Sequence, residues 1–303
     1  MAMDEEKSIP GSRFAHLQSP INSPSSKMGS QMEGTSILLN NFNISTWLTM
    51  GACLQCILFI VLPRYVALLP AFVFLTSRLV HVGLVTQGWA KNPLLPPEQL
   101  LTKVTAPIPN EDGTQLVKAG EREVVCFLVG SNCNHPMGVF SPGFKVIAKY
   151  FSDMWVEADT NREKWGFLGK STITTMPTPG GGSALITISY WRSIDHLHAF
   201  AASPLHKAGW EWFGQITKKW PHIGILHETF EAKERGWENV YKNSWPVGMG
   251  QAQHLVRESP DAEPRWVNSL MPAKGGRWKT MRNRMGTEEG FDEEFEHDLP
   301  TGI

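Results

Sequence analysis

Histidine is the residue type in this chain best suited to acid–base chemistry, and it is concentrated in one stretch. Four of the ten histidines lie between His196 and His222, and His227 follows five residues later. An imidazole titrates close to neutral pH, so a histidine that faces a pocket can act as a general base. We therefore take His206 and His227 as the strongest catalytic candidates.

Glu228 and Tyr241 complete the candidate catalytic set, as an acid–base group and an orienting group. His227 and Glu228 are neighbours in a predicted strand, so their side chains point to opposite faces and only one is expected at a pocket. Structural alternatives remain open for three of the four. His206 could sit at the edge of the core, His227 could bond a backbone carbonyl, and Glu228 could pair with a basic side chain.

Aromatic residues supply candidate walls for such a pocket. The twelve tryptophans are many for 303 residues and suggest a pocket for an apolar ligand. Trp210 and Phe213 follow His206 at helical spacing, and Trp191 ends the strand before that helix. We expect Trp191, Trp210 and Phe213 to line the substrate site.

The overall composition excludes one class of partner and indicates a compartment. The formal charge of −1 gives no reason to expect a nucleic-acid partner. Four cysteines form no credible disulfide framework, which favours a reducing environment that faces the cytosol.

The elements that would position these side chains alternate between strand and helix patterns. Ser193, and the Ser-Pro pairs at 141–142 and 203–204, predict helix starts, because serine caps a helix and proline suits its first position. The expected order is a strand at 124–129, a helix from 142, strands at 167–176 and 184–191, a two-part helix at 193–220 and a strand at 223–230.

This β-α-β-β-α-β order predicts an α+β, ferredoxin-like domain over residues 122–256. Two helices cover only one face of a four-stranded antiparallel sheet, yet the strands at 124–129 and 184–191 are apolar on both faces. A second copy of the sheet is the simplest cover, so we expect a homodimer that forms a dimeric α/β barrel. Cover by the N-terminal segment or by a C-terminal arm is the alternative.

The N-terminal third differs in composition. Residues 1–43 are expected to be disordered, and residues 91–121 are expected to form a Pro-rich linker. Within 44–90, residues 44–62 carry no charge, and these 19 residues can cross ~30 Å of hydrocarbon as a helix. We predict a transmembrane helical hairpin with Arg64 at its tip and both ends in the cytosol. One span followed by an interfacial segment, or a soluble buried helix pair, are the alternatives.

The C-terminal part is expected to be simpler. Residues 236–246 are rich in aromatic side chains and predict an arm that packs over the domain or over the second copy of a dimer. From Arg257 charge, proline and glycine increase, so residues 257–303 are expected to form a solvated charged tail.

A family resemblance rests on the strand–helix core. Residues 190–193, with Leu197, Phe200 and His206, resemble that core in antibiotic-biosynthesis-monooxygenase-like proteins. Residues 224–230 and 241–248 are similar to one branch, found in bacteria and in fungal secondary-metabolite clusters. The membrane segment resembles that of fungal members, among them monooxygenases of fumagillin-type terpenoid pathways.

The resemblance implies a membrane-anchored monooxygenase that uses O₂, without a cofactor, to oxidise a small apolar intermediate of the terpenoid class. Its membrane would be the endoplasmic reticulum, with the catalytic domain facing the cytosol. Two alternatives stay open: a haem-dependent dehydratase of the same superfamily, and a non-catalytic dimeric binding module. Haem is the weaker reading, because Trp210 holds the position equivalent to the ligand of haem-degrading members. No metal site is expected.

Overall fold

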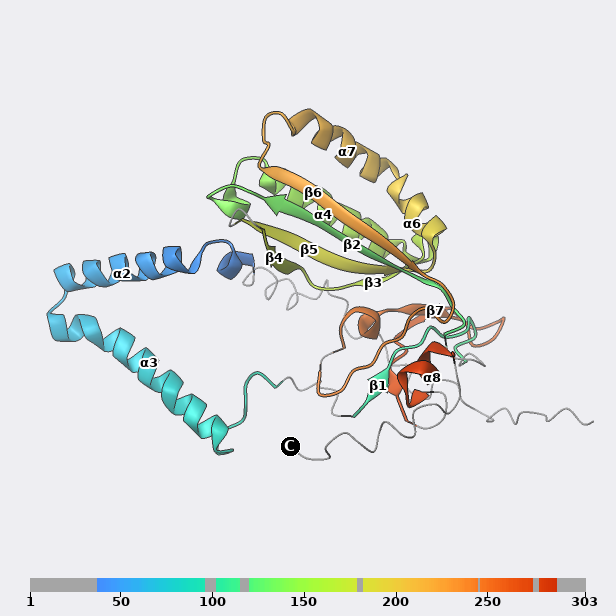
Figure 1. Ribbon diagram of the computed structural model, residues 1–303, viewed down its shortest axis with the longest axis horizontal. Coiled ribbons are helices and arrows are strands. Elements are labelled where there is room, and N and C mark those ends of the chain that lie inside the picture. The colour runs from blue at the N-terminus through green and yellow to red at the C-terminus, as the bar shows by residue number, and fades with distance from the viewer. Residues whose placement is uncertain are drawn as a thin grey trace, which may run out of the picture.

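The computed structural model describes residues 37–95, 102–114, 120–178, 182–244, 246–274 and 278–287. In this part of the chain, an antiparallel sheet carries helices on one face, and two long helices precede it (Figure 1). The expected disordered N-terminus up to residue 36, and the end of the expected tail from residue 288, lie outside the described residues. The same prediction is wrong for residues 37–43, which are ordered and include a helical turn at 37–40.

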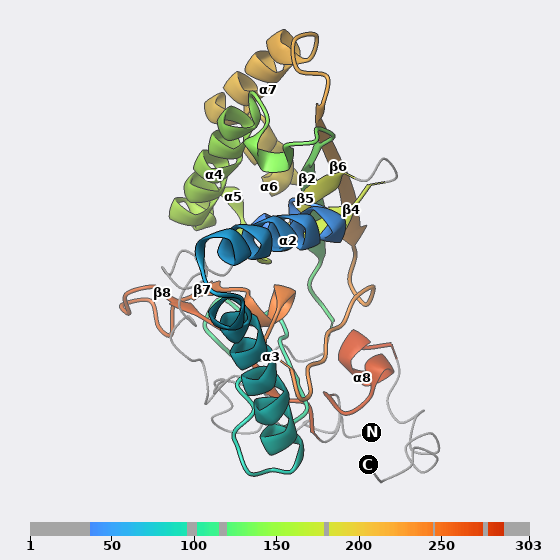
Figure 2. The same ribbon diagram turned by 90° about the vertical axis from the view of Figure 1, so that its left-hand side faces the viewer.

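The central unit has the predicted ferredoxin-like arrangement. Its sheet order is β3-β5-β2-β6, every pairing is antiparallel, and β4 also pairs with β5. Figure 2 shows the helices gathered on one side of the sheet. The elements are β2 (Val124–Cys133), η1 (Gly138–Phe140), α4 (Phe144–Thr160), α5 (Arg162–Trp165), β3 (Phe167–Lys170), β4 (Thr174–Pro177), β5 (Ser183–Trp191), α6 (Ile194–Ala201), α7 (Pro204–Ile216) and β6 (Ile223–Ala232).

Helix capping explains two of the three predicted helix starts. The side chains of Ser193 and Ser203 accept hydrogen bonds from backbone N–H groups three residues on, and α7 begins at Pro204. The prediction for Ser141 is wrong. Gly143, in a left-handed conformation, precedes α4, while the Ser141 hydroxyl is buried 3.1 Å from the thiol of Cys133.

The core lies between the sheet and the helices. Val125 of β2, Phe167 of β3 and Trp191 of β5 pack there against Leu197 and Phe200 of α6. These five side chains are almost fully buried. These side chains identify the helix-covered face of the sheet. Because side chains alternate along a strand, they also identify the face on which every other strand residue lies.

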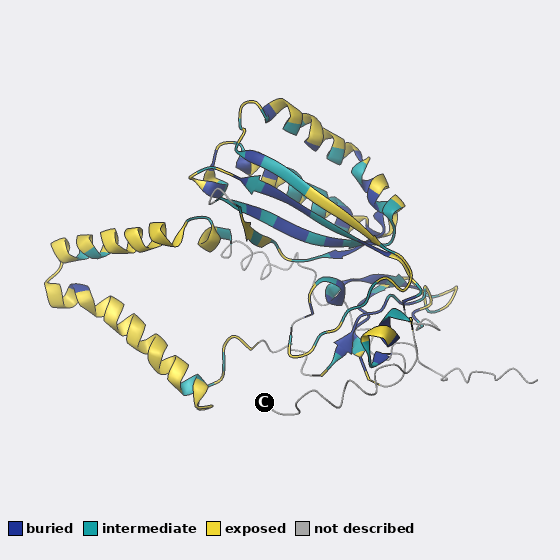
Figure 3. Ribbon diagram, viewed as in Figure 1, coloured by how far each residue is buried: buried dark blue, intermediate teal, exposed yellow. Residues whose placement is uncertain are grey.

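Two helices, α2 (Ile44–Val61) and α3 (Arg64–Thr86), are long and apolar enough to cross a membrane by length and composition. They form a hairpin, in which the Gln55 side chain donates a hydrogen bond to the Ala67 carbonyl at 3.0 Å. Apart from Ala67, neither helix has a buried residue, as Figure 3 shows in yellow. The two helices are therefore not buried against the described rest of the chain, as a soluble buried helix pair would be.

The expected charged tail is wrong for residues 257–274 and 278–287, which belong to a folded C-terminal unit. In this unit a strand that precedes the central sheet in the sequence pairs with a strand that follows it. Val256, Val267 and Asn268 are buried in the unit. It contains β1 (Val104–Thr105), η2 (Gly248–Gln251), β7 (His254–Val256), β8 (Arg265–Val267), β9 (Met271–Pro272) and α8 (Met281–Met285).

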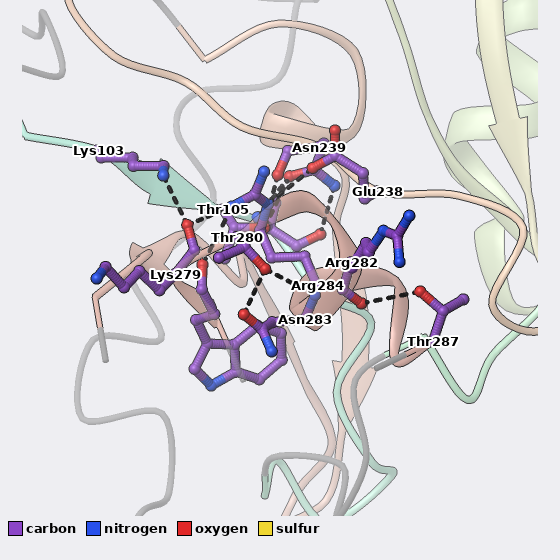
Figure 4. A network of polar contacts seen from close by, with 12 residues as sticks. Lys103, Thr105, Glu238, Asn239, Lys279, Thr280, Arg282, Asn283, Arg284 and Thr287 are labelled. Atoms are coloured by element: carbon purple, nitrogen blue, oxygen red, sulfur yellow. Dashed lines mark hydrogen bonds and ion pairs between the residues drawn. The ribbon is translucent and has the colours of Figure 1, made fainter. Parts of the chain in front are cut away.

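Polar contacts hold the C-terminal unit together (Figure 4). Arg284 is buried, donates to Glu238 at 2.7 Å, and donates again to the Trp278 and Lys279 carbonyls. Asn239 bonds both backbone groups of Ala106. The expected linker at 91–121 thus includes residues that are built into this unit.

Candidate functional site

Two cavities lie between the helices and the sheet. The smaller has a volume of about 260 Å³ and lies among α4, α6, α7, β2 and β6. The larger, of about 910 Å³, runs along the other side of α4 above β5 and β3. Val129, Ile147, Phe151 and Trp155 line both, so the two cavities share a wall.

Both candidate histidines line the small cavity. His206 comes from the first turn of α7, where its backbone N–H donates to the capping Ser203 hydroxyl at 3.3 Å. His227 comes from β6 and pairs across the ladder with Val129. The His227 ring lies 5.6 Å from the Phe127 ring, centre to centre. A helix cap and a strand register thus place two imidazoles in one apolar space.

The surroundings keep the His206 imidazole neutral. Burial is the main influence on the pKa of His206 and lowers it below its ordinary value. A hydrogen bond to the backbone of Ala201 raises the pKa, and the nearby His227 lowers it further. A neutral imidazole at neutral pH can accept a proton. His206 therefore has the protonation state that a general base requires.

Two of the three expected lining residues face this cavity. Trp210 and Phe213 line it, with their rings 5.9 Å apart and nearly perpendicular. Trp191 does not. It has no exposed surface, it packs in the core, and its indole N–H donates to the Ser189 hydroxyl at 3.0 Å.

Glu228 and Tyr241 lie away from the histidines. Glu228 pairs with Leu128 on β2 and points to the helix-free face of the sheet. Tyr241 belongs to the C-terminal unit, where its hydroxyl donates to the Val247 carbonyl and accepts from the Gly250 N–H, each at 2.8 Å. Burial is the main reason that the pKa of Tyr241 rises to about 12. The structure does not bring these two residues to the site with His206.

The large cavity was missed by the sequence analysis. Its floor includes Thr187 and Ser131 on the helix-covered face of the sheet, and Gln251 closes it from the C-terminal unit. The Ser131 hydroxyl donates to the Gly224 carbonyl, whereas the Thr187 hydroxyl has no hydrogen-bond partner within the described ranges. Thr187 is thus a polar group available to a ligand. The sequence signal for this cavity was the Thr187 hydroxyl in a strand whose other residues are mostly apolar.

Metal and haem fit these residues poorly. Among the described residues, no group of three or more His, Cys, Asp and Glu side chains could hold a metal ion. The His206 imidazole faces a space of about 260 Å³, below the roughly 300–1,000 Å³ of pockets for drug-sized ligands. The described lining of the large cavity contains no histidine. The histidine and the volume that a haem requires are therefore in different places.

Comparison with known proteins gives matches in sequence and in structure. The model of the family described as monooxygenase af470-like matches residues 124–249. Monooxygenase af470 of Aspergillus fumigatus is 31% identical over 274 residues, which cover 89% of this chain and 98% of that protein. The part of this chain outside the match is shorter than the segment 44–86, so the match includes at least part of that segment.

Solved structures with a partial likeness include an aldoxime dehydratase, OxdRE, in complex with butyraldoxime. It has 15% identity and a TM-score of 0.35, and the match covers 52% of this chain and 37% of that one. A putative antibiotic biosynthesis monooxygenase from Caulobacter crescentus has 19% identity and a TM-score of 0.26, over 36% and 91%. SnoaB, a cofactor-independent oxygenase from Streptomyces nogalater, has 13% identity and a TM-score of 0.23, over 36% and 91%.

Proposed function

The chain belongs to the monooxygenase af470-like family, and from that premise we propose a membrane-anchored monooxygenase that oxidises an apolar, terpenoid-like intermediate of secondary metabolism. One observation carries the proposal. A neutral His206 and a neighbouring His227 line an apolar cavity that shares a wall with a much larger one. The large cavity has room for the body of such a substrate, and the small one for its reacting group.

The proposed chemistry uses no cofactor and asks little of the protein. The substrate carries an activated methylene group, and His206 takes one of its protons, which leaves an electron-rich carbon. That carbon gives an electron pair to O₂, and the peroxide anion that forms takes the proton back from His206 to become a hydroperoxide. Loss of the second proton breaks the O–O bond, so the methylene becomes a carbonyl and the other oxygen leaves as water. O₂ is the oxidant, and one of its atoms enters the product.

The protein's contribution is a dry pocket with a few polar groups. Apolar walls, including Phe127, Trp210 and Phe213, keep water from the electron-rich carbon. His227 is the second imidazole in reach and is proposed to donate to the developing oxyanion. The unpartnered Thr187 hydroxyl in the large cavity is proposed to hold a polar group of the substrate.

The proposed anchor is the α2–α3 hairpin. Most of its side chains are apolar and exposed, and Arg64 stands at the turn between the helices. Trp47 near the start of α2 and Trp89 just after α3 suit the two places where the chain would meet the membrane surface. We propose that the hairpin lies in the endoplasmic reticulum membrane, with the catalytic domain in the cytosol.

The helix-free face of the sheet is proposed to pair with a second copy of the chain. Leu128, Leu226 and Phe230 share that face, and the Phe230 side chain is 55% exposed. Such an apolar sheet face gains stability when another sheet covers it. The pairing would complete the dimeric barrel.

The experiment supplies the purified full chain in lipid nanodiscs with ¹⁸O₂ and a panel of compounds that contain an activated methylene, anthrone and terpenoid ketones among them. A product with one ¹⁸O atom, formed by the wild type and lost in His206→Ala and His227→Ala, supports the proposal. Glu228→Gln is the matched control, because it changes the neighbour of His227 on the opposite face. Equal product from all variants would refute the histidine roles, and no labelled product from any of them, the wild type included, would favour a binding module.

A further inference from the structure

The residues just ahead of α2 are docked on the catalytic domain. The Asn41 side-chain amide donates to the Met137 carbonyl at 3.3 Å, and its oxygen accepts from the Val139 N–H at 2.7 Å. A single side chain therefore satisfies two backbone groups of the loop at η1. The Phe42 ring also stacks on Phe140, with ring centres 6.3 Å apart and planes 22° from parallel.

Gly138 permits this close approach. Its φ of +54° favours glycine, and a Cβ atom there would lie 2.0 Å from the Asn41 side-chain oxygen. Any other residue at 138 would push the Asn41 side chain away. The contact between the hairpin and the domain is thus specific. We call this contact of Asn41 with the loop at Gly138 the Asn41–Gly138 joint.

The same joint forms one end of the large cavity. Ile37, Val139, Phe140 and Phe144 line that end, and all four belong to or adjoin the docked segments. Only Asn43 separates Phe42 from the first residue of α2, and two residue steps span at most roughly 7 Å. A membrane around α2 would therefore begin next to the end of the cavity.

We propose that the large cavity takes its substrate directly from the lipid phase, through a mouth that the Asn41–Gly138 joint holds at the membrane surface. The inference rests on the proposed membrane anchor. It specifies the ligand as an apolar molecule dissolved in the bilayer, and α4 as the helix along which it travels. Direct transfer avoids exposing the apolar surface of the ligand to water, which is costly.

The probe is a long-chain alkyl alcohol that carries a photoreactive diazirine, dissolved in phosphatidylcholine nanodiscs that hold the full chain. Illumination followed by peptide mass spectrometry should find labels on the cavity side of α4, at Phe151 and Trp155. Labels on α2 and α3 alone in the wild type would overturn the proposal.

Two tryptophan substitutions on α4 test the route. Ala148 lines the large cavity and is exposed, so Ala148→Trp should block the mouth and reduce labelling of Phe151 roughly tenfold, the effect of ~1.4 kcal/mol of lost binding. Val146 is exposed on the same helix but lines neither cavity, so Val146→Trp should label as the wild type does. Equal labelling in both variants would contradict the route.

Asn41→Leu and Gly138→Ala test the joint. Both should reduce α4 labelling from nanodiscs while leaving labelling by a short, water-soluble diazirine alcohol unchanged, which also shows that the domain is folded. Unchanged labelling from nanodiscs would refute the role of the joint. Because labelling needs no turnover, a labelled cavity without ¹⁸O incorporation would refute the proposed reaction and leave this inference standing.

Discussion

His254 should make the stability of this protein depend on pH in the mildly acidic range. It begins β7 in the C-terminal unit, is 4% exposed, and its Nε2 atom has no hydrogen-bond partner in the described part of the chain. Burial, and then the positive charges of Arg192 and Arg162, lower the pKa of His254 to about 3. The folded protein therefore holds this imidazole neutral well below pH 6.5.

The sign and size follow from linkage. Between the folded value of about 3 and the ordinary value of 6.5, the unfolded chain binds a proton that the folded chain does not, so the free energy of unfolding falls as pH falls. At about 1.36 kcal/mol per pKa unit, the loss from pH 7 to pH 5 is about 2 kcal/mol. Little is lost above pH 7, where both states are neutral.

Urea unfolding of the detergent-solubilised full chain at pH 7 and pH 5, followed by tryptophan fluorescence, measures this loss. His254→Gln should remove about 2 kcal/mol of the pH dependence, since glutamine is neutral at both values. His198→Gln is the control, because His198 is exposed. If the wild type and His254→Gln lose the same free energy of unfolding between pH 7 and pH 5, the reasoning is refuted.

Four further outcomes are expected. The kcat/KM of the wild type should fall as pH drops below 6.5 through the lowered pKa of His206, and His206→Ala should lose that limb with roughly 10²–10⁴ of the rate. Tyr241→Phe should cost about 1–3 kcal/mol in urea unfolding and leave turnover unchanged, because its hydroxyl bonds two backbone groups away from the cavities. Arg284→Met should leave Glu238 unpaired, cost about 3–5 kcal/mol and expose the C-terminal unit to limited proteolysis, and an unchanged digestion pattern would contradict this. Phe230→Glu should convert the proposed dimer into a monomer in sedimentation velocity, and a persistent dimer would exclude the helix-free face as the interface.

Local signals were sufficient where the cause of an element is local. Ser193 and Ser203 cap their helices because each serine directly precedes a helical pattern, and its hydroxyl reaches the backbone N–H three residues on. Ser141 looks the same in sequence but is buried beside Cys133. Tertiary packing took that hydroxyl away from the helix, and no pattern within one segment reports such a contact.

The folded C-terminal unit was beyond sequence reasoning for a related reason. Charge near the C-terminus usually indicates a solvated tail, yet Arg284 is buried and pairs with Glu238, 46 residues earlier. Its guanidinium also bonds two carbonyls, so the charge is compensated by partners from distant segments. Pairings over such separations are set by the fold and cannot be seen in the composition of the tail.

The choice between His227 and Glu228 shows where sequence and fold each contribute. Alternation along a strand says that the two side chains face opposite ways, but not which face the helices cover. Apolar residues on β2 do not decide it, because Val125 and Phe127 face one side and Val124 and Leu128 the other. The decision comes from chain topology.

A strand–helix–strand crossover is right-handed in nearly all proteins. The direction of β2 and the position of β3, which runs parallel to β2 on the far side of β5, therefore dictate the side on which α4 lies. The β2–β6 register then pairs Val129 with His227 on that side, and Leu128 with Glu228 on the other. Backbone chirality thus selects the imidazole, and not the carboxylate, for the cavity. A one-residue slip of β6 against β2 would reverse the choice, so the β2–β6 pairing is as necessary to the proposed site as the histidine itself.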